Sequence, residues 1–500
     1  MNIFASFRQK QIKNNLHLYK NMQMKKYFHL LSFFIIIISC TNENTLGSDP
    51  INTTENLTIF ILNDIHGQID NFAKVKYLVD QEKTKTNVIL TSAGDIFSGN
   101  PIVDNYPQKG YPIIDIMNRV GFDVSVIGNH EFDYGEVNLK DRMEQATFDW
   151  VCANVQTDAS VIPQPSPYTT ITVNDLKITF LGLVETDGKE NATIPSTHPW
   201  RVQNLVFERP ENVVANYANI KAEEDADLLI ALTHIGFSKS GNRLGDSQLA
   251  TQFPFFDLII GGHSHSKINE VINDIPIFQA GSYLNHIGKI ELTISNKKVK
   301  EISYKLIDLN VITDEDPELK SIIDNYNDEP FFKEVIGFSE VNHSRSQVGN
   351  FTADALRRQM NVDIAFQNTG GVRTDLALGD IKKKDIFQIL PFNNPTIVYS
   401  MTVSEVKNFL KGTGAGFYYS GVTFQKANNE VVVRDLNGDI IPGSTILTIG
   451  VNDYIPAVHD TYFPTSKIVK AQTDAETVIS YLKQVNNQVN YSTSNKYFKF

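Results

Sequence analysis

The sequence is poor in cysteine, with only Cys40 and Cys152 among its 500 residues. A chain of this length cannot rest on a disulfide framework, so a packed core has to stabilise it. A Gly-x-Ser-x-Gly elbow is also absent, which removes one signature of serine-hydrolase chemistry. Cys152 follows Trp150-Val151 with no motif around it, and we expect a small core residue there, not a nucleophile.

Basic residues are outnumbered, with 45 Lys and Arg against 57 Asp and Glu and a formal net charge of −12. The first 39 residues hold six of the basic residues and no acidic ones, so the remainder carries 39 against 57, or −18. Such a chain lacks the basic surface that replaces the counterions of a nucleic-acid polymer. A small anionic substrate is still compatible with this balance, because bound metal ions can supply positive charge locally.

The most apolar run, Tyr27 to Ser39, is too short to span a bilayer. It follows the basic segment Met24-Lys25-Lys26, and this order is typical of an export signal. The run ends in Ile37-Ile38-Ser39-Cys40, which resembles a bacterial lipobox. That resemblance implies a signal peptide at 1–39, with Met24 as an alternative start, and a lipidated Cys40.

Residues 40–56 then form an expected flexible tether, rich in Asn, Thr and Ser. The lipobox implies an exported protein that is anchored to a bacterial membrane through Cys40 and faces the periplasm or the cell surface. A plain signal peptide or an uncleaved anchor is the alternative.

Between residues 57 and 310, short apolar runs alternate with helical patterns. Five of these runs predict buried strands that are followed at once by polar residues or glycine: Thr58–Leu62, Val88–Thr91, Val124–Ile127, Leu228–Leu232 and Leu258–Ile260. This order is typical of layered α/β domains, whose functional loops leave the ends of central strands. Lys289–Ile294 and Val299–Leu306 predict a closing hairpin.

Residues 311–334 are charged and carry a helical pattern from Asp316 onward, which predicts a linker helix. A second domain is expected at 335–500. Its predicted helices are Gly349–Met360, Val403–Lys411 and Asp474–Val489, with strands between them. We expect Asn350 to cap the first of these helices.

Metal-binding residue types follow all five predicted buried strands. The segments are Asn63-Asp64-Ile65-His66-Gly67, Gly94-Asp95, Gly128-Asn129-His130-Glu131-Phe132-Asp133, Leu232-Thr233-His234 and Gly261-Gly262-His263-Ser264-His265. One histidine or Gly-Asp pair after a strand is usually an ordinary loop feature. Core packing does not require metal-binding residue types after five successive strands. Carboxylate, imidazole and amide donors suit divalent ions such as Zn²⁺, Mn²⁺ or Fe²⁺, so the set predicts a metal site.

Taken in order, these motifs resemble the calcineurin-like metallophosphoesterase superfamily, in the forms found in bacterial 5′-nucleotidases. The resemblance implies an α/β protein with a four-layer αββα catalytic sandwich at 57–310 and a smaller α+β substrate-binding domain after the linker. It also implies two divalent metal ions as cofactors.

The same resemblance assigns roles to individual residues. The first metal would be held by Asp64, His66 and His265, the second by Asn129, His234 and His263, and both by a bridging Asp95. His130 would be the catalytic histidine that binds no metal, oriented by Asp133. Position 265 is often Gln or Asn in the 5′-nucleotidase branch, which bears on metal preference and not on binding itself.

Three segments of the second domain resemble the substrate-binding motifs of the same family. Asn368-Thr369-Gly370-Gly371-Val372-Arg373 matches a motif whose Asn and Arg contact substrate. Leu390-Pro391-Phe392 and Asn452-Asp453-Tyr454 match segments whose rings stack on a nucleobase. The resemblance further implies a nucleoside contact from Asp460 and a phosphate contact from Arg345. Val458-His459-Asp460 departs from the usual Gly-Gly-Asp, which leaves base specificity open.

The resulting expectation is an extracytoplasmic hydrolase that converts nucleoside 5′-monophosphates to nucleoside and phosphate with metal-activated water. A 2′,3′-cyclic-nucleotide phosphodiesterase or a nucleotide-diphospho-sugar hydrolase on the same scaffold is the alternative. A binding protein that has lost catalysis, or a heterodimeric sulfur-oxidation relative, is more remote. A small nucleotide is the expected partner, and no protein partner is implied.

Overall fold

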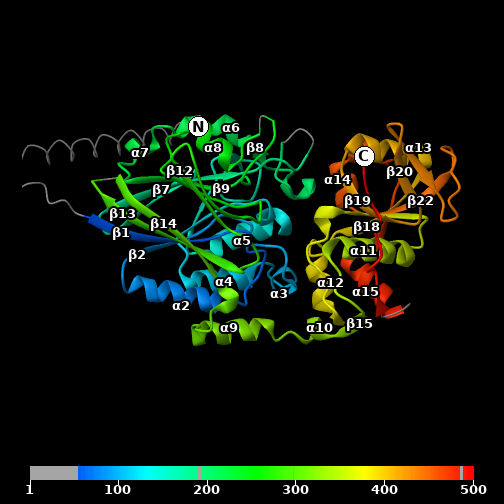
Figure 1. Ribbon diagram of the computed structural model, residues 1–500, viewed down its shortest axis with the longest axis horizontal. Coiled ribbons are helices and arrows are strands. Elements are labelled where there is room, and N and C mark those ends of the chain that lie inside the picture. Colours follow the sequence, from blue (N-terminus) through cyan, green and yellow to red (C-terminus); the bar gives the residue numbers. More distant parts are fainter. Residues whose placement is uncertain (1–53, 190–192, 242, 297, 485–487) are drawn as a thin grey trace, which may run out of the picture. The chain divides into compact units, whose positions relative to one another are not determined.

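Two six-stranded sheets dominate the N-terminal part of the chain in the computed structural model, which describes residues 54–189, 193–241, 243–296, 298–484 and 488–500 (Figure 1). The first sheet has the order β14-β13-β1-β2-β3-β4, with β1 (Thr54–Leu62), β2 (Asn87–Ser92), β3 (Val124–Val126), β4 (Asp149–Val151), β13 (His286–Ser295) and β14 (Lys298–Asp308). The second has the order β11-β12-β10-β9-β7-β6, with β6 (Tyr168–Val173), β7 (Leu176–Val184), β9 (Leu228–His234), β10 (Leu258–Gly261), β11 (Lys267–Ile272) and β12 (Ile275–Ala280). All five predicted buried strands and the closing hairpin are therefore confirmed.

Alternating side chains place each sheet between two cores. Along β1, Ile59 and Ile61 pack into the core between the sheets together with Ile230 of β9. Phe60 points the other way and packs with Phe72 of the helical layer. This period of two is the one expected for a strand buried on both faces.

Helices cover the outer face of each sheet, which completes the expected αββα layering (Figure 1). The helices α2 (Phe72–Lys83), α3 (Pro101–Asp104), α4 (Tyr111–Val120) and α5 (Glu136–Gln145) belong to the first sheet's side. The helices α6 (Pro210–Val213), α7 (Ile220–Glu223) and α8 (Asp246–Gln252) belong to the second's. Short 3₁₀ helices at η1 (His130–Tyr134), η2 (Pro199–Val202) and η3 (Val214–Tyr217), and a β5 (Val155–Gln156) to β8 (Val206–Phe207) pair, complete this part.

The predicted linker helix is two helices, α9 (Pro317–Asn327) and α10 (Pro330–Lys333), which follow a 3₁₀ turn, η4 (Leu309–Val311). Asp316 caps α9 by accepting a hydrogen bond from the Leu319 backbone N–H at 2.8 Å. Pro330 has no N–H to continue that helix and instead opens α10, capped by Glu329. The position of the linker was predicted, and its division at the proline was not.

The C-terminal part is built on a sheet of order β23-β18-β22-β16-β19-β25. Its strands are β16 (Ile364–Asn368), β18 (Pro395–Thr402), β19 (Gly416–Ser420), β22 (Ile446–Asn452), β23 (Ile468–Thr473) and β25 (Tyr497–Lys499). Smaller sheets contain β15 (Val335–Ser339), β17 (Gly379–Lys382) and β24 (Gln488–Val489), and β20 (Thr423–Ala427) with β21 (Glu430–Arg434). The helices are α11 (Arg345–Met360), α12 (Lys383–Ile389), α13 (Val403–Thr413), α14 (Tyr454–Val458) and α15 (Asp474–Gln484), with 3₁₀ turns η5 (Thr369–Gly371) and η6 (Asp460–Tyr462).

Two local predictions in this part are wrong. Ser344, not Asn350, is the N-cap of α11, because the helix begins five residues before Asn350. Asn350 lies inside the helix, where its buried side chain accepts a hydrogen bond from the Ser494 hydroxyl at 3.1 Å. The last helix ends at Gln484, and Gln488–Val489 form a strand beside β15.

Cys152 is buried in the core of the N-terminal part, as predicted. Burial raises the pKa of its thiol to about 12, so the thiolate needed for nucleophilic chemistry is scarce at neutral pH. The signal segment, Cys40 and the tether lie outside the described residues. Among the described residues, the helices are too short or too polar to cross a membrane.

Candidate metal centre

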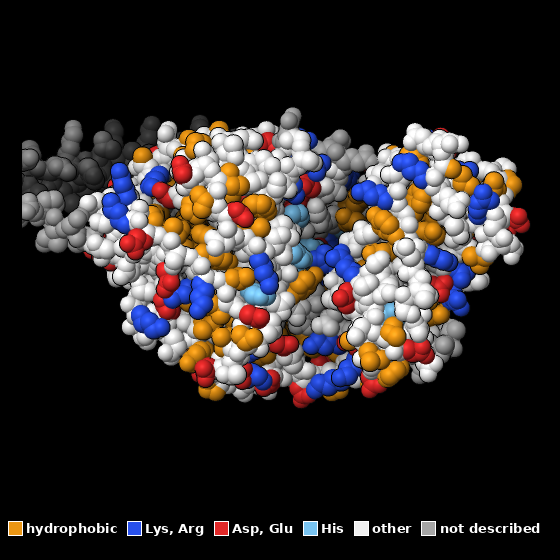
Figure 2. Space-filling view, in the orientation of Figure 1, with side chains coloured by type: hydrophobic (Ala, Val, Ile, Leu, Met, Phe, Trp, Pro, Cys, Tyr) orange, Lys and Arg blue, Asp and Glu red, His pale blue; other side chains and the backbone are white. Residues whose placement is uncertain are grey.

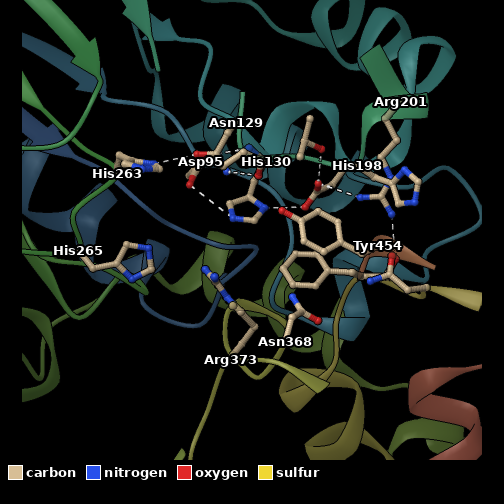
Figure 3. A pocket seen from close by; sticks show the side chains of 16 residues that line it. Asp95, Asn129, His130, His198, Arg201, His263, His265, Asn368, Arg373 and Tyr454 are labelled. Atoms are coloured by element: carbon tan, nitrogen blue, oxygen red, sulfur yellow. Dashed lines mark hydrogen bonds and ion pairs between the residues drawn. The ribbon is translucent and has the colours of Figure 1, made fainter. Parts of the chain in front are cut away.

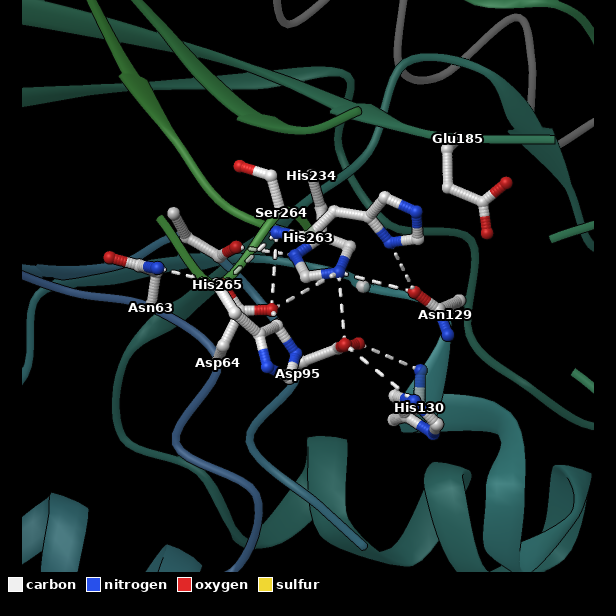
Figure 4. A network of polar contacts seen from close by, with 12 residues as sticks. Asn63, Asp64, Asp95, Asn129, His130, Glu185, His234, His263, Ser264 and His265 are labelled. Carbon is white, nitrogen blue, oxygen red and sulfur yellow. Dashed lines mark hydrogen bonds and ion pairs between the residues drawn. The ribbon is translucent and has the colours of Figure 1, made fainter. Parts of the chain in front are cut away.

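The predicted metal ligands lie at the carboxyl ends of five strands in the two sheets (Figure 4). Strands β1, β2 and β3 run parallel, and so do β9 and β10. Their carboxyl ends therefore meet at common edges, and the loops that follow them bring distant residues together. The residues concerned are Asp64 and His66 after β1, Asp95 after β2, Asn129 after β3, His234 at the end of β9, and His263 and His265 after β10.

The donors form two groups that share Asp95. Each residue of a group offers one ligand atom, and within each group these atoms all lie within 4.8 Å of one another. The groups are Asp64, His66, Asp95 and His265, and Asp95, His234 and His263. Asn129 joins the second, because its Oδ1 is 3.2 Å from His234 Nε2 and 3.0 Å from His263 Nδ1. The structure thus brings together all seven residues that the sequence singled out as ligands.

Several potential ligand atoms face one another at short range. His66 Nε2 lies 2.9 Å from His265 Nε2, and His265 Nε2 lies 3.4 Å from Asp64 Oδ1. His234 Nε2 lies 3.1 Å from Asp95 Oδ2. Converging imidazole and carboxylate lone pairs suit a divalent cation, which places opposite charge between them.

Buried hydrogen bonds fix the direction of these side chains. His66 Nδ1 donates to the Ser98 carbonyl at 3.0 Å, and His234 Nδ1 donates to the Ala93 carbonyl at 2.7 Å. In each ring the Nε2 atom is left to face the cluster. Such partners typically set the tautomer of metal-binding histidines and orient them.

The charge states of the cluster also suit cations. Burial lowers the pKa of His66 well below its usual range, and the nearby Arg373 lowers it further. Burial raises the pKa of Asp64 to about 7. Burial opposes a charged His234, yet the Asp95 carboxylate raises the pKa of that imidazole to about 10. Buried carboxylates thus need positive charge, and protonated His234 supplies part of it in the protein alone.

Five of the seven ligand candidates adopt a left-handed backbone: Asp64, His66, Asp95, His263 and His265, with φ between 50° and 74°. Residues with a side chain seldom adopt this conformation, and for histidine and aspartate it carries a conformational cost. The surrounding hydrogen bonds hold it in place: Asp64 N donates to Gly94 O at 3.0 Å and His66 N to Asp95 O at 2.9 Å.

Glu131 organises the loops around Asp95, a role that the sequence did not reveal. Its buried carboxylate accepts hydrogen bonds from the backbone N–H groups of Asp95 at 3.0 Å, Ile96 at 2.6 Å and Gly128. Burial raises the pKa of this carboxyl to about 7. The position of Glu131 next to Asn129-His130 pointed to the site, but hydrogen bonds to backbone N–H groups cannot be recognised from residue types.

His130 and Asp133 form a hydrogen-bonded pair beside the cluster. His130 Nδ1 lies 2.6 Å from Asp133 Oδ2, and its Nε2 lies 3.9 Å from Asp95 Oδ2. Although burial opposes it, the charge of His130 lowers the pKa of Asp133 to about 2. Burial also disfavours a charged His130, but Asp95 and Asp133 outweigh it and raise the imidazole's pKa. Thr197 Oγ1 and Arg201 Nη1 donate to Asp133 Oδ1 at 3.0 and 2.9 Å.

A pocket of about 190 Å³ adjoins this pair, and both the N-terminal and the C-terminal parts of the chain line it (Figure 3). The C-terminal part contributes Asn368, Gly370, Arg373, Phe392, Asn394 and Tyr454. Arg373 Nη2 lies 3.3 Å from His66 Nε2, and the Phe392 ring stacks on His130 with centroids 5.5 Å apart at 11°. In the space-filling view, histidine side chains come to the surface at a hollow beside Lys and Arg side chains (Figure 2).

Two of the predicted substrate residues do not line this pocket. Asp460 is exposed and lines a second hollow of about 520 Å³ together with His198 and Asp453. Arg345 is also exposed, and its Nη2 donates to the Thr369 carbonyl at 3.1 Å. It therefore binds the turn between Asn368 and Arg373.

Comparison with known families agrees with this geometry. Residues 57–267 match the family described as calcineurin-like phosphoesterase, and residues 332–465 match the 5′-nucleotidase C-terminal domain. The chain belongs to the calcineurin-like phosphoesterases that carry a 5′-nucleotidase C-terminal domain. This is a family of metal-dependent phosphoester hydrolases with a dimetal centre, and the Asp and His cluster offers the donors for one.

Individual relatives of this chain are distant in sequence. The chain is 28% identical to the trifunctional nucleotide phosphoesterase protein YfkN of Bacillus subtilis over 87% of its own length, but it spans only 34% of that protein. It is 27% identical to the 5′-nucleotidase of Vibrio cholerae, covering 76% of this chain and 80% of the relative. The crystal structure of a 5′-nucleotidase precursor from Thermus thermophilus superposes with a TM-score of 0.77 at 21% identity over 88% of this chain and 98% of the other, which shows a common fold.

Proposed function

We propose that this protein hydrolyses nucleoside 5′-monophosphates to nucleoside and phosphate. The observation that carries the proposal is the composition of one pocket. It joins Asp95 and Asn129 of the metal centre, and the neighbouring His130, to Arg373 and to the rings of Phe392 and Tyr454. We assign catalysis to residues 57–310, substrate binding to 335–500 and the connection to 311–334.

In this proposal Asp64, His66 and His265 would hold one ion, Asn129, His234 and His263 the other, and Asp95 both. The bound ions would supply Lewis-acid charge at the phosphoryl oxygens and make a water molecule more acidic.

Arg373 has a phosphate-binding role in this mechanism. Its guanidinium reaches within 3.3 Å of His66 Nε2, so it faces the edge of the metal centre. A guanidinium fork donates two parallel hydrogen bonds to a phosphate group, which both binds and orients it. Phe392 and Tyr454 would hold the base by stacking, since rings accept any base on their faces.

His130 would donate a proton to the leaving 5′-oxygen. Its Nδ1 is engaged by Asp133, so Nε2 is the nitrogen that faces the pocket. An alkoxide is a poor leaving group, and a positioned acid of raised pKa relieves the negative charge that develops on it.

A cyclic-nucleotide phosphodiesterase or a nucleotide-diphospho-sugar hydrolase is the second candidate. The exposed position of Asp460 favours it, because the nucleoside contact expected of this residue does not reach the pocket. The name of the Bacillus relative, a trifunctional nucleotide phosphoesterase, is compatible with more than one phosphoester substrate. The complete donor set speaks against a protein that has lost catalysis.

We also infer export and lipid anchoring at Cys40, on the strength of the segment Met24 to Cys40. Labelling of the wild-type protein with a fatty-acid analogue in a bacterial host, and loss of the label in Cys40→Ala, would support this. A label that persists in the variant would exclude Cys40 as the lipid site.

The test of the proposed function is phosphate release from AMP by residues 41–500, stripped with chelator and resupplied with Mn²⁺ or Zn²⁺. Release that stops on stripping and returns with metal is the expected result. Folded, metal-loaded protein that leaves AMP intact but cleaves 2′,3′-cyclic AMP or UDP-glucose would replace the first candidate by the second.

A further inference from the structure

Arg201 makes two hydrogen bonds that join the proposed catalytic pair to the proposed base-binding segment. It lies in η2, with a side chain only 8% exposed. Nη1 donates to Asp133 Oδ1 at 2.9 Å, and Nη2 donates to the Phe392 carbonyl at 3.0 Å. The two acceptors are 259 residues apart in sequence, counting from Asp133 to Phe392, so one buried guanidinium links distant segments.

The first bond bears on the orientation of His130. A carboxylate can swivel unless both its oxygens are held. Arg201 and Thr197 hold Oδ1 of Asp133, which leaves Oδ2 for His130 Nδ1 at 2.6 Å. The imidazole can then present only Nε2 to the pocket.

The second bond bears on the position of Phe392. The ring of this residue stacks on the same imidazole at 5.5 Å, while its carbonyl is held by Arg201. Asp133 thus contacts the edge of the His130 ring, and Phe392 contacts its face. Arg201 donates a hydrogen bond to each of these two residues. The planar fork of arginine can serve two acceptors at once, which a lysine ammonium on a flexible stem does less well.

We propose that Arg201 is a positioning residue that makes proton donation by His130 depend on the docked Phe392 segment. The inference rests on the proposed function, since it takes His130 as the acid and Phe392 as a base contact. A nucleotide held by that segment would then meet an aligned imidazole. Arg201 lines the pocket as well, but it acts through Asp133 and not on the reacting atoms.

The test compares two esters with different leaving groups. The group that leaves AMP is the adenosine 5′-alkoxide, which needs a proton, whereas p-nitrophenyl phosphate releases a stable phenolate, which does not. Arg201→Lys is expected to lower kcat for AMP by about tenfold or more, a part of the 10²–10⁴ that a general acid typically contributes. The KM for AMP and the kcat for the aryl phosphate are expected to change by less than about threefold.

Thr197→Val is the comparison variant, because it removes the other donor to Asp133 Oδ1 and leaves the Arg201 bond to Phe392 in place. It is expected to lower kcat for AMP less than Arg201→Lys does. Arg119→Lys, at a surface ion pair with Asp115, is the matched control that is expected to leave kcat for AMP unchanged. Bound metal and melting temperature of all three variants are measured alongside, so that a damaged site or fold is recognised.

Four outcomes would overturn the inference. Wild-type kcat for AMP in Arg201→Lys, or equal losses on the two esters, would leave Arg201 with a packing role only. An equal loss in Thr197→Val would mean that any support of Asp133 suffices and that the link to Phe392 is idle. A wild-type enzyme that cleaves the aryl phosphate and not AMP would overturn the proposed function, and the inference with it.

Discussion

Asp95 is the residue on which both donor groups depend. Its Oδ2 lies 3.1 Å from His234 Nε2 and 3.9 Å from His66 Nε2, which belong to different groups. Its Oδ1 accepts a hydrogen bond from the His130 backbone N–H at 2.8 Å. One carboxylate therefore contacts each donor group and the loop that carries the proposed acid.

Asp95→Asn is expected to reduce phosphate release from AMP by more than about 100-fold, because Asp95 would bind both ions directly and residues that only support metal ligands already cost up to about 100-fold. The amide keeps the shape but loses the negative charge that attracts two cations. The measurement is kcat in metal-replete enzyme, with exposed Asp158→Asn as the control. Activity near that of the wild type would rule out a bridging role.

Phe392→Ala is expected to raise KM for AMP about tenfold, because stacking of one base on a ring contributes roughly 1–3 kcal/mol. Hydrolysis of p-nitrophenyl phosphate should change less, since it has no base to stack. Exposed Phe331→Ala is a control for loss of an aromatic ring elsewhere. The same loss of kcat/KM on both esters would argue against stacking and for a purely structural ring.

The sequence singled out the ligand candidates, which the structure brings together, because residue types that bind metals follow successive strands. It did not predict Glu131, which accepts hydrogen bonds from backbone N–H groups, or the hydrogen bond from Arg201 to the Phe392 carbonyl. Those partners belong to every residue and leave no compositional signal. Asp460 was singled out by alignment with a motif, yet its side chain faces a different hollow, since a motif does not determine where its loop turns.

At the scale of elements, the strand ends determine the site. Parallel strands were predictable from their apolar runs, but their distribution over two sheets was not, because burial on both faces gives the same pattern in either sheet. The positions of the helices could be predicted from hydrophobic periodicity, whereas the residues at which they end could not. Pro330 divides the linker, and the strand Gln488–Val489 pairs with β15 across 150 residues of sequence.

The first residue of α15, Asp474, gives this element a measurable pH dependence. The residue is 1% exposed, and its carboxyl accepts a hydrogen bond from the Ala475 backbone N–H at 2.9 Å. Burial raises its pKa to about 7, whereas an unfolded chain has the ordinary value near 3.8. The folded state therefore holds the proton more tightly, and this stability is present at low pH and lost as the pH rises through 7.

Asp474→Asn removes this titration while keeping the shape of the side chain. The free energy of unfolding of the variant, relative to wild type, is expected to improve by about 2 kcal/mol between pH 5 and pH 8. Urea unfolding at the two pH values measures it, with exposed Asp439→Asn as the control. A variant whose pH dependence parallels that of the wild type would show that Asp474 is ionised in the fold at pH 5.

At the scale of the whole molecule, the metal centre and pocket join segments from both halves of the chain. Arg373 reaches His66 across 307 residues of sequence, and Arg201 reaches Phe392 across 191. No periodicity in the chain specifies such contacts. They arise from how the two parts pack, which is why the pocket's membership could be expected only from resemblance to a family.

Metal removal is expected to lower the melting temperature of the whole protein. Ions that bind only the folded state stabilise it by about 2.7 kcal/mol at a free concentration 100 times the dissociation constant. Because the cluster contains buried carboxylates, adding Zn²⁺ or Mn²⁺ to protein stripped with chelator should raise its melting temperature measurably. His265→Ala, which removes one partly exposed donor from the first group, is expected to reduce the shift. An unchanged melting temperature at saturating metal would contradict a metal site formed by folding.

The left-handed backbone of Asp64, His66, Asp95, His263 and His265 has a consequence for directed evolution. Glycine would relax the backbone at each of these positions, and when no metal is bound the carboxylates and imidazoles that it removes have no cation between them. A library screened for heat resistance in the presence of chelator, with no demand for turnover, should therefore enrich glycine there. The same library screened for growth on a nucleotide as phosphate source should keep every one of them, so the two selections would diverge first at these five codons.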